Sequence, residues 1–120
     1  MHFKINIEIY NMMIFVFHHM DMKESIEACE KKFNMTLNKD MAKNADALTV
    51  YPPNNQPYVG MLFHENSVNG LLGNIHHESI HVAMHILHSR GVEISYENDE
   101  ALTYLSTFIF KKICRKLELL

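Results

Sequence analysis

The chain has 120 residues, of which 48% are apolar and 21% charged, and its formal net charge is −3. This composition is typical of one folded domain spanning residues 1–120, and the lack of a basic balance argues against nucleic acid as a partner. The longest apolar runs, such as Met12–Phe17, are too short to cross a bilayer, so we expect no membrane span. Cys29 and Cys114 are far apart in the sequence, and we expect both to be reduced and the protein to be cytoplasmic.

The N-terminal third predicts two strands followed by a helix. Apolar and polar residues alternate over Phe3–Ile9, which is typical of a half-buried strand, and Met12–Phe17 predicts a second, buried strand. Asp21 followed by Glu24 has the capping-box pattern. We therefore expect a helix that begins there and runs to about Phe33.

The middle of the chain predicts a loop and then a hairpin. Residues 34–45 are polar and mixed, and we interpret them as a loop that can include a helical turn. Two apolar segments, Ala47–Tyr51 and Tyr58–Phe63, flank a Pro-rich turn cluster and predict two paired strands. Gly60 lies inside the second segment and indicates a close approach by another backbone, such as that of a bound peptide.

The most informative segment is residues 74–90, which contains His77-Glu78-Ser79-Ile80-His81, a match to H-E-x-x-H. Apolar residues recur at helical spacing, no proline interrupts them, and Gly91 is a typical helix end, so the segment predicts an amphipathic helix. Residues four apart lie on one helical face, and His77 and His81 can therefore bind one Zn²⁺. Glu78 lies beside them and can accept a proton from a metal-bound water.

A catalytic zinc site needs three protein ligands and one open position. Glu100 follows His81 after a segment long enough to turn the chain back, and it is expected to begin a final helix that runs to about Leu117. Glu100 is therefore the candidate third ligand, although Glu97 and Asp99 are alternatives.

These residues resemble a known family. H-E-x-x-H followed about twenty residues later by a glutamate on a second helix resembles the gluzincin pattern of zinc metallopeptidases. Asp99-Glu100-Ala101-x-x-Tyr104 also resembles the Glu-Ala-x-x-aromatic signature of small minigluzincins, including the ImmA/IrrE-type proteins. Residues 58–110, somewhat under half the chain, are similar to short H-E-x-x-H proteins of tailed phages.

The resemblance implies a fold and an activity. The fold would be α+β and zincin-like, with about four strands packed by three helices, of which the second carries H-E-x-x-H and the third the glutamate ligand. The activity would be that of a zinc-dependent peptidase acting on a peptide or protein, in the host cytoplasm if the protein is phage-encoded. Zn²⁺ would be held by His77, His81 and Glu100, with Glu78 as the general base.

In zincin-like folds the edge strand before the motif helix pairs with extended substrate. The resemblance therefore makes Tyr58–Phe63 the candidate for that role, with Gly60, Met61 and Leu62 as substrate-contacting positions. An ordinary sheet strand without a role in binding is an equally good interpretation of the same residues.

The sequence also departs from the family pattern. Thermolysin-type gluzincins carry an aspartate four residues after the glutamate ligand, where this chain has Tyr104, a weaker and uncharged hydrogen-bond acceptor. Tyr104 and Tyr96 are candidates to hydrogen-bond the metal ligands or a developing oxyanion, and packed aromatic residues are the alternative.

Two further functional hypotheses remain open at this point. The first is a non-catalytic zinc-binding interaction module, in which His85 or His64 closes the metal site as a fourth ligand. The second is a metal-free domain whose His-rich helix is incidental. The sequence pattern leaves the substrate and the oligomeric state open.

Overall fold

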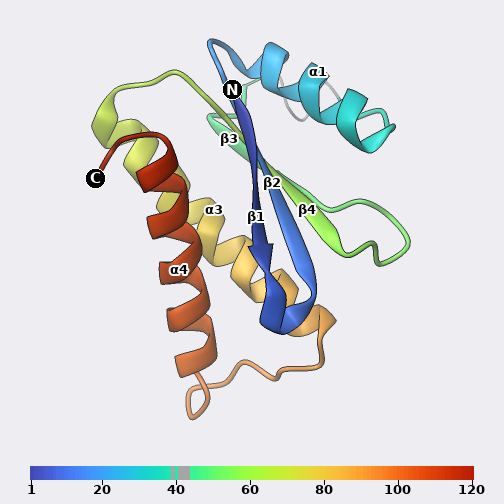
Figure 1. The fold of residues 1–120 in the computed structure, drawn as a ribbon, viewed down its shortest axis with the longest axis vertical. Coiled ribbons are helices and arrows are strands. Elements are labelled where there is room, and N and C mark those ends of the chain that lie inside the picture. The colour runs from blue at the N-terminus through green and yellow to red at the C-terminus, as the bar shows by residue number, and fades with distance from the viewer. Residues whose placement is uncertain (39, 41–43) are drawn as a thin grey trace.

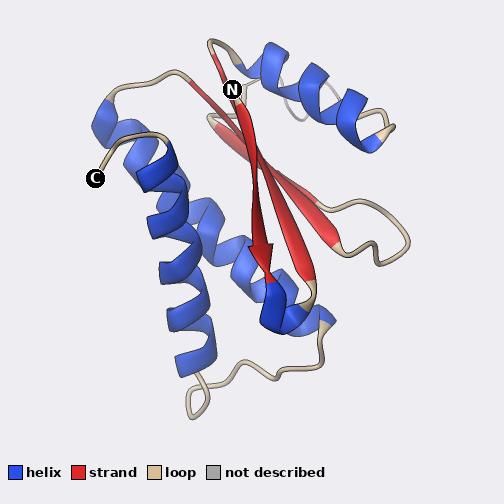
Figure 2. Ribbon diagram, in the orientation of Figure 1, coloured by secondary structure: helices blue, strands red, loops and turns tan. Residues whose placement is uncertain are grey.

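The computed structural model describes residues 1–38, 40 and 44–120. Within them, a four-stranded mixed sheet carries one helix on one face and two on the other (Figure 1, Figure 2). The elements are β1 (His2–Ile7), the 3-10 turn η1 (Glu8–Tyr10), β2 (Met12–His19), α1 (Met22–Phe33), β3 (Ala47–Val50), β4 (Tyr58–His64), α3 (Val68–Ser89) and α4 (Glu100–Lys116). The predicted α+β class, with four strands and three α-helices, is confirmed.

The sheet order is β1-β2-β4-β3. The outer pairs β1–β2 and β3–β4 are antiparallel, whereas the central pair β2–β4 is parallel, with Met13 opposite Tyr58. The predicted pairing of the two segments around the Pro-rich turn is confirmed, because Ala47 lies opposite Phe63 and Val50 opposite Gly60. The edges of the sheet are therefore β1 and β3.

Side chains on the two faces of the sheet form two separate cores. The larger core joins strand residues to α3 and α4, and its fully buried members include Ile14, Val16, Met61, Phe63, Ile75, Val82, Ile86, Ile109 and Ile113. The smaller core joins Phe17 and Leu62 to the apolar side of α1. Full burial of each such side chain contributes roughly 1.5–3 kcal/mol, so the apolar side of α3 is fixed on the sheet and its histidines face outward.

Local signals explain where α1 begins and where the first strands end. The Asp21 carboxylate accepts a 2.9 Å hydrogen bond from the Glu24 amide, which confirms the predicted cap. β1 ends two residues earlier than predicted because η1 follows it, and Asn11 closes that turn with a φ of 50°. β2 extends beyond its predicted end because His18 and His19 continue the parallel pairing with β4.

The structure corrects the predicted edge strand. β4, which includes the proposed substrate segment Tyr58–Phe63, lies between β2 and β3, and its backbone pairs on both sides. Met61 and Leu62 are fully buried. The close approach at Gly60 comes from Phe33 of α1, because a Cβ at Gly60 would lie 2.8 Å from the Phe33 ring. The free edge near α3 belongs to β3 instead.

The motif helix is confirmed as α3. Its N-cap is Ser67, whose hydroxyl accepts a 3.1 Å hydrogen bond from the Gly70 amide, and Gly91 follows its end with a φ of 74°. None of the helices described here is long and apolar enough to cross a membrane. The predicted loop over residues 34–45 lies partly outside the described residues, which omit 39 and 41–43.

Both cysteines are buried free thiols, in agreement with the expected reduced state. Burial, reinforced by the nearby Glu30 carboxylate, raises the pKa of Cys29 to about 12. Cys29 is therefore an apolar packing residue of the smaller core and not a reactive thiolate.

Candidate metal centre

His77 and His81 lie one turn apart on the exposed side of α3. Their Nε2 atoms are 3.0 Å apart, and their ring centroids are 4.7 Å apart with a 70° angle between the planes. Two nitrogens bound to one tetrahedral Zn²⁺ at its usual bond length lie about 3.3 Å apart. The same 3.0 Å is also the length of a hydrogen bond between two neutral imidazoles. The pair therefore presents two nitrogen atoms at a spacing that fits one metal ion.

Glu78 is turned toward β3 and is only 9% exposed. The Thr49 hydroxyl donates a 2.8 Å hydrogen bond to its Oε2 atom. Thr49 lies two residues after Ala47 on the same face of β3, which is the face that meets α3. The hydrogen bond from Thr49 orients the Glu78 side chain. A carboxylate has several acceptor sites, so Glu78 can also accept a hydrogen bond from a second donor.

A pocket of about 350 Å³ lies where β3 begins and α3 passes it. Its lining residues are Asp46, Ala47, Gly73, Asn74, His77 and Glu78. Gly73 helps to open this space, since a Cβ at that position would meet nothing within 4 Å. Two carboxylates and one imidazole line the pocket, with no Lys or Arg among its lining residues. The pocket therefore favours a cation or a hydrogen-bond donor as its occupant.

One further contact joins the end of β3 to α3. The rings of Tyr51 and His85 lie with centroids 4.1 Å apart and an interplanar angle of 33°. Burial first, and then the negative charge of Glu78, raises the pKa of Tyr51, so its phenol is a protonated hydrogen-bond donor near neutral pH. Burial also lowers the pKa of His85, with a smaller effect from His88, which favours the neutral imidazole.

Sequence reasoning did not identify Thr49 and Tyr51 as members of the site. The sequence feature that could have grouped them is their spacing in the predicted strand Ala47–Tyr51. Side chains two residues apart in a strand lie on one face, so residues 47, 49 and 51 share a face. The pattern does not reveal which element covers that face. Only the sheet order, with β3 at the edge beside α3, brings Thr49 to Glu78 and Tyr51 to His85.

The structure does not bring Glu100 to the histidine pair. α3 and α4 pack side by side, and their alignment is shown by the contact between His76 and Phe110, whose ring centroids are 6.0 Å apart. Glu100 is the first residue of α4 and lies about 15 Å along that helix from Phe110. His76 faces α4, whereas Glu78 contacts β3 on another side of α3. Glu100 therefore lies beyond the level of His81 and next to a different face.

None of the other predicted partners joins the histidine pair in a metal-binding group within the described residues. Tyr96 is 98% exposed and Tyr104 is 74% exposed, and Tyr104 lines a separate groove between η1 and α4. His64 lies 3.8 Å from an Asp46 carboxylate oxygen, and its Nδ1 atom lies 2.8 Å from the Glu65 carbonyl oxygen. His85 is stacked on Tyr51.

Among residues 1–38, 40 and 44–120, no three His, Cys, Asp or Glu side chains come together in a group that could hold a metal. Glu97 and Asp99, the alternative third ligands, therefore do not form such a group with the histidine pair either. The described residues thus fit a metal ion through two protein ligands, His77 and His81, and do not form the three-ligand set that the family resemblance implies.

Comparison of the sequence with protein-family models and with curated proteins, and of the chain with solved structures, finds no match. The assignment of a function therefore depends on the residues of the site itself.

Proposed function

We propose that the chain binds one Zn²⁺ through His77 and His81 and acts as a zinc-dependent peptidase with Glu78 as its proton acceptor. The observation that carries this proposal is the 3.0 Å distance between the two exposed Nε2 atoms, which fits two ligands of one metal. The pairing of these histidines with a buried, hydrogen-bonded glutamate on the next residue supports a role beyond metal storage.

Bound zinc would supply a Lewis acid and an acidified water at this site. The residues of the chain have separate roles around it. Thr49 orients Glu78, and Glu78 accepts a proton on a carboxylate oxygen and later returns it to the leaving amine. Tyr51, whose pKa is raised, remains a neutral donor close to this carboxylate and takes the role first expected of Tyr96 or Tyr104.

The free edge of β3 provides a place for an extended substrate. An edge strand has unpaired backbone groups, and a peptide can add to it as a further strand. Ala47 lines the pocket that holds His77 and Glu78, so a peptide paired with β3 would pass beside both side chains. This assigns substrate binding to β3 in place of Tyr58–Phe63.

A second candidate function is a zinc-binding interaction module without catalysis. The observation that favours it is the separation of Glu100 from the histidine pair, which leaves the metal with two protein ligands. A side chain from a bound protein would then complete the coordination, and the metal would join the two molecules.

Metal binding is tested first. Titration of the chelator-treated protein with Co²⁺ or Zn²⁺, read by visible absorption and calorimetry, is expected to show one bound equivalent. His77→Ala and His81→Ala are each expected to abolish it, whereas His76→Ala, an exposed neighbour that faces α4, is expected to bind normally. Equal binding by all three variants, or no binding by the wild type, would refute the metal site.

Catalysis is tested second, with fluorescently labelled unfolded proteins and a peptide library as substrates. The peptidase proposal predicts cleavage by the zinc-loaded wild type and, for Glu78→Gln, full metal binding with at least a hundredfold loss of cleavage. Zinc binding without any cleavage would favour the interaction module. Cleavage that survives Glu78→Gln would show that Glu78 is not the base.

A further inference from the structure

The face of α4 that points away from the sheet carries large apolar residues that the described part of the chain leaves exposed. Phe108 is 42% exposed and Tyr104 is 74% exposed, one turn apart. Both border a groove of about 800 Å³ between α4 and η1, where Ile9 is 85% exposed. Figure 1 shows α4 along one side of the molecule, on the side opposite α1. Large exposed apolar side chains gathered in one place are typical of an interaction surface.

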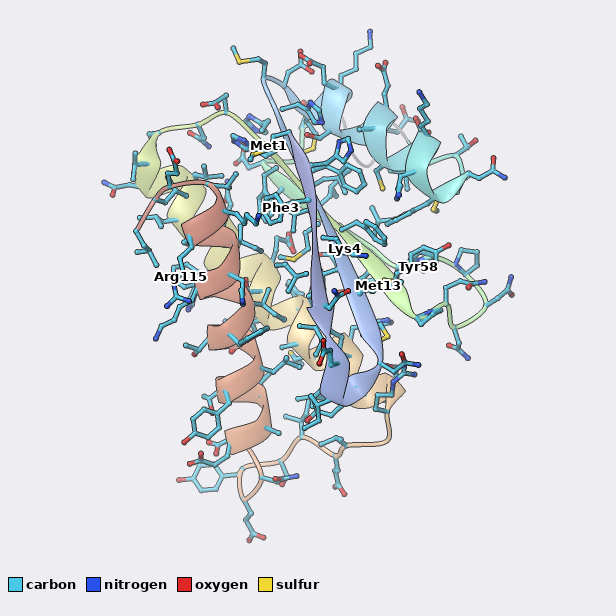
Figure 3. All side chains as sticks on the ribbon, viewed as in Figure 1. Met1, Phe3, Lys4, Met13, Tyr58 and Arg115 are labelled. Atoms are coloured by element: carbon cyan, nitrogen blue, oxygen red, sulfur yellow. The ribbon has the colours of Figure 1, made fainter. Side chains whose placement is uncertain are left out.

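Charges divide along the same helix. The acidic residues Asp99 and Glu100 lie at its beginning, and the basic residues Lys111, Lys112, Arg115 and Lys116 lie in its last turns. The aromatic pair lies between these two ends. Figure 3 shows Arg115 on the outer side of α4, directed away from the sheet. At about 100° per residue, Glu100, Tyr104, Phe108, Lys111 and Arg115 fall on one side of α4, whereas Lys112 and Lys116 lie toward its flank. This side is thus acidic at its beginning, apolar in its middle and basic at its end.

This order of charges is complementary to itself when the helix is reversed. We propose that two copies of the chain pair through this face of α4, antiparallel about a two-fold axis near Phe108. In that arrangement the two Phe108 rings meet at the axis, and Glu100 of each copy lies opposite Arg115 of the other. The acidic-to-basic contact occurs twice, as two-fold symmetry requires.

The same alignment places each Tyr104 opposite Lys111 of the other copy. A lysine ammonium group above an aromatic ring makes a favourable cation–π interaction. Within one chain, Lys112 Nζ lies 5.4 Å from the centroid of the Phe108 ring. A parallel arrangement would instead place the basic ends together, and repulsion would oppose it. The second copy then covers the apolar groove, which explains why Ile9, Tyr104 and Phe108 are exposed in the single chain.

Sedimentation velocity over a wide concentration range measures the pairing. The wild type is expected to associate to a dimer, and Phe108→Asp is expected to weaken the dimer by more than about tenfold. Met84→Asp is the matched control, since Met84 is also 42% exposed but lies on α3 away from the proposed face, and it should dimerise normally. A wild type that stays monomeric, or a dimer that Phe108→Asp leaves intact, would overturn the proposal.

Charge exchange tests the alignment independently of the apolar contact. Glu100→Lys and Arg115→Glu are each expected to weaken the dimer, because each places like charges opposite one another. The double variant carries both changes on one chain and restores opposite charges in both contacts, so its dimer should recover. Failure of this rescue would rule out the antiparallel alignment. These measurements are made with chelator present, so their outcome does not depend on the proposed metal site.

Discussion

The hydroxyl of Thr49 donates a 2.8 Å hydrogen bond to Oε2 of Glu78, and it is a direct polar link between the edge strand β3 and the motif helix α3. The bond joins an element that could bind substrate to the residue proposed to accept a proton. Its loss should therefore affect both the stability of the fold and the orientation of Glu78.

Replacement of Thr49 by Val keeps the shape of the side chain and removes the donor. Because Glu78 is buried, an unsatisfied carboxylate oxygen should lower the free energy of unfolding by about 1–3 kcal/mol, measured by urea denaturation. Thr36→Val makes the same change at an exposed loop residue and is expected to change stability by less than about 0.5 kcal/mol. Equal stability of the two variants would show that the bond contributes nothing.

The position of Glu100 leads to a second prediction. Because Glu100 lies beyond His81 and beside another face of α3, Glu100→Gln should change the affinity for Zn²⁺ or Co²⁺ by less than about twofold. The family resemblance gives the opposite expectation, since loss of one of three ligands should weaken binding strongly. A calorimetric titration of the variant beside His81→Ala decides between them, and a large loss would mean that α4 moves toward the metal.

Replacement by alanine should change the free energy of unfolding in opposite directions at two glycines, Gly60 and Gly73. A Cβ at Gly60 would lie 2.8 Å from the Phe33 ring, which packs against Phe15, Phe17 and Tyr58 and has little room to shift. Gly60→Ala should therefore destabilise the protein by about 1–3 kcal/mol. Gly73 lies in α3 with open space around it, so Gly73→Ala should stabilise the protein by about 0.5–1 kcal/mol. Thermal denaturation of both variants tests the pair, and a shared sign would contradict the packing at Gly60.

Two neighbouring histidines give the protein a dependence on pH. Burial, the largest effect on each, lowers the pKa of His18 and of His19 below 6.5, although Glu65 partly opposes this at His18. The unfolded chain then takes up protons first as the pH falls, so the free energy of unfolding should decline from pH 6.5 down to the lowered pKa values.

Urea denaturation above and below that pH measures the decline. The double variant His18→Gln, His19→Gln should show a smaller one, whereas His88→Gln, which changes an exposed histidine of α3, should behave as the wild type. An identical decline in all three proteins would assign the effect to other groups.

Elements with strong local signals could be predicted from the sequence. α1 and α3 have capping residues, Asp21 and Ser67, whose side chains accept backbone hydrogen bonds from Glu24 and Gly70. Each also has apolar residues at helical spacing, which the two cores bury. The spacing of His77 and His81 is likewise a local property of one helix, and the structure brings their nitrogens together.

Relationships between elements could not be predicted in the same way. The edge position of β3 depends on the parallel pairing of β2 with β4, which no short segment encodes. The place of Glu100 depends on how far α3 continues after His81. α3 extends to Ser89, about two turns further, so the chain reverses too late to return the first residue of α4 to the level of His81.

The parallel seam between β2 and β4 also has a kinetic consequence. Each outer pair of strands is joined by a short connection and can form early, but Met13 meets Tyr58 only after a long loop has closed. Folding is therefore expected to proceed through two independently formed hairpins whose docking limits the rate. Because the hairpins are already formed when they dock, substitutions that weaken either hairpin should slow refolding, as should substitutions between β2 and β4 that weaken the docking contact.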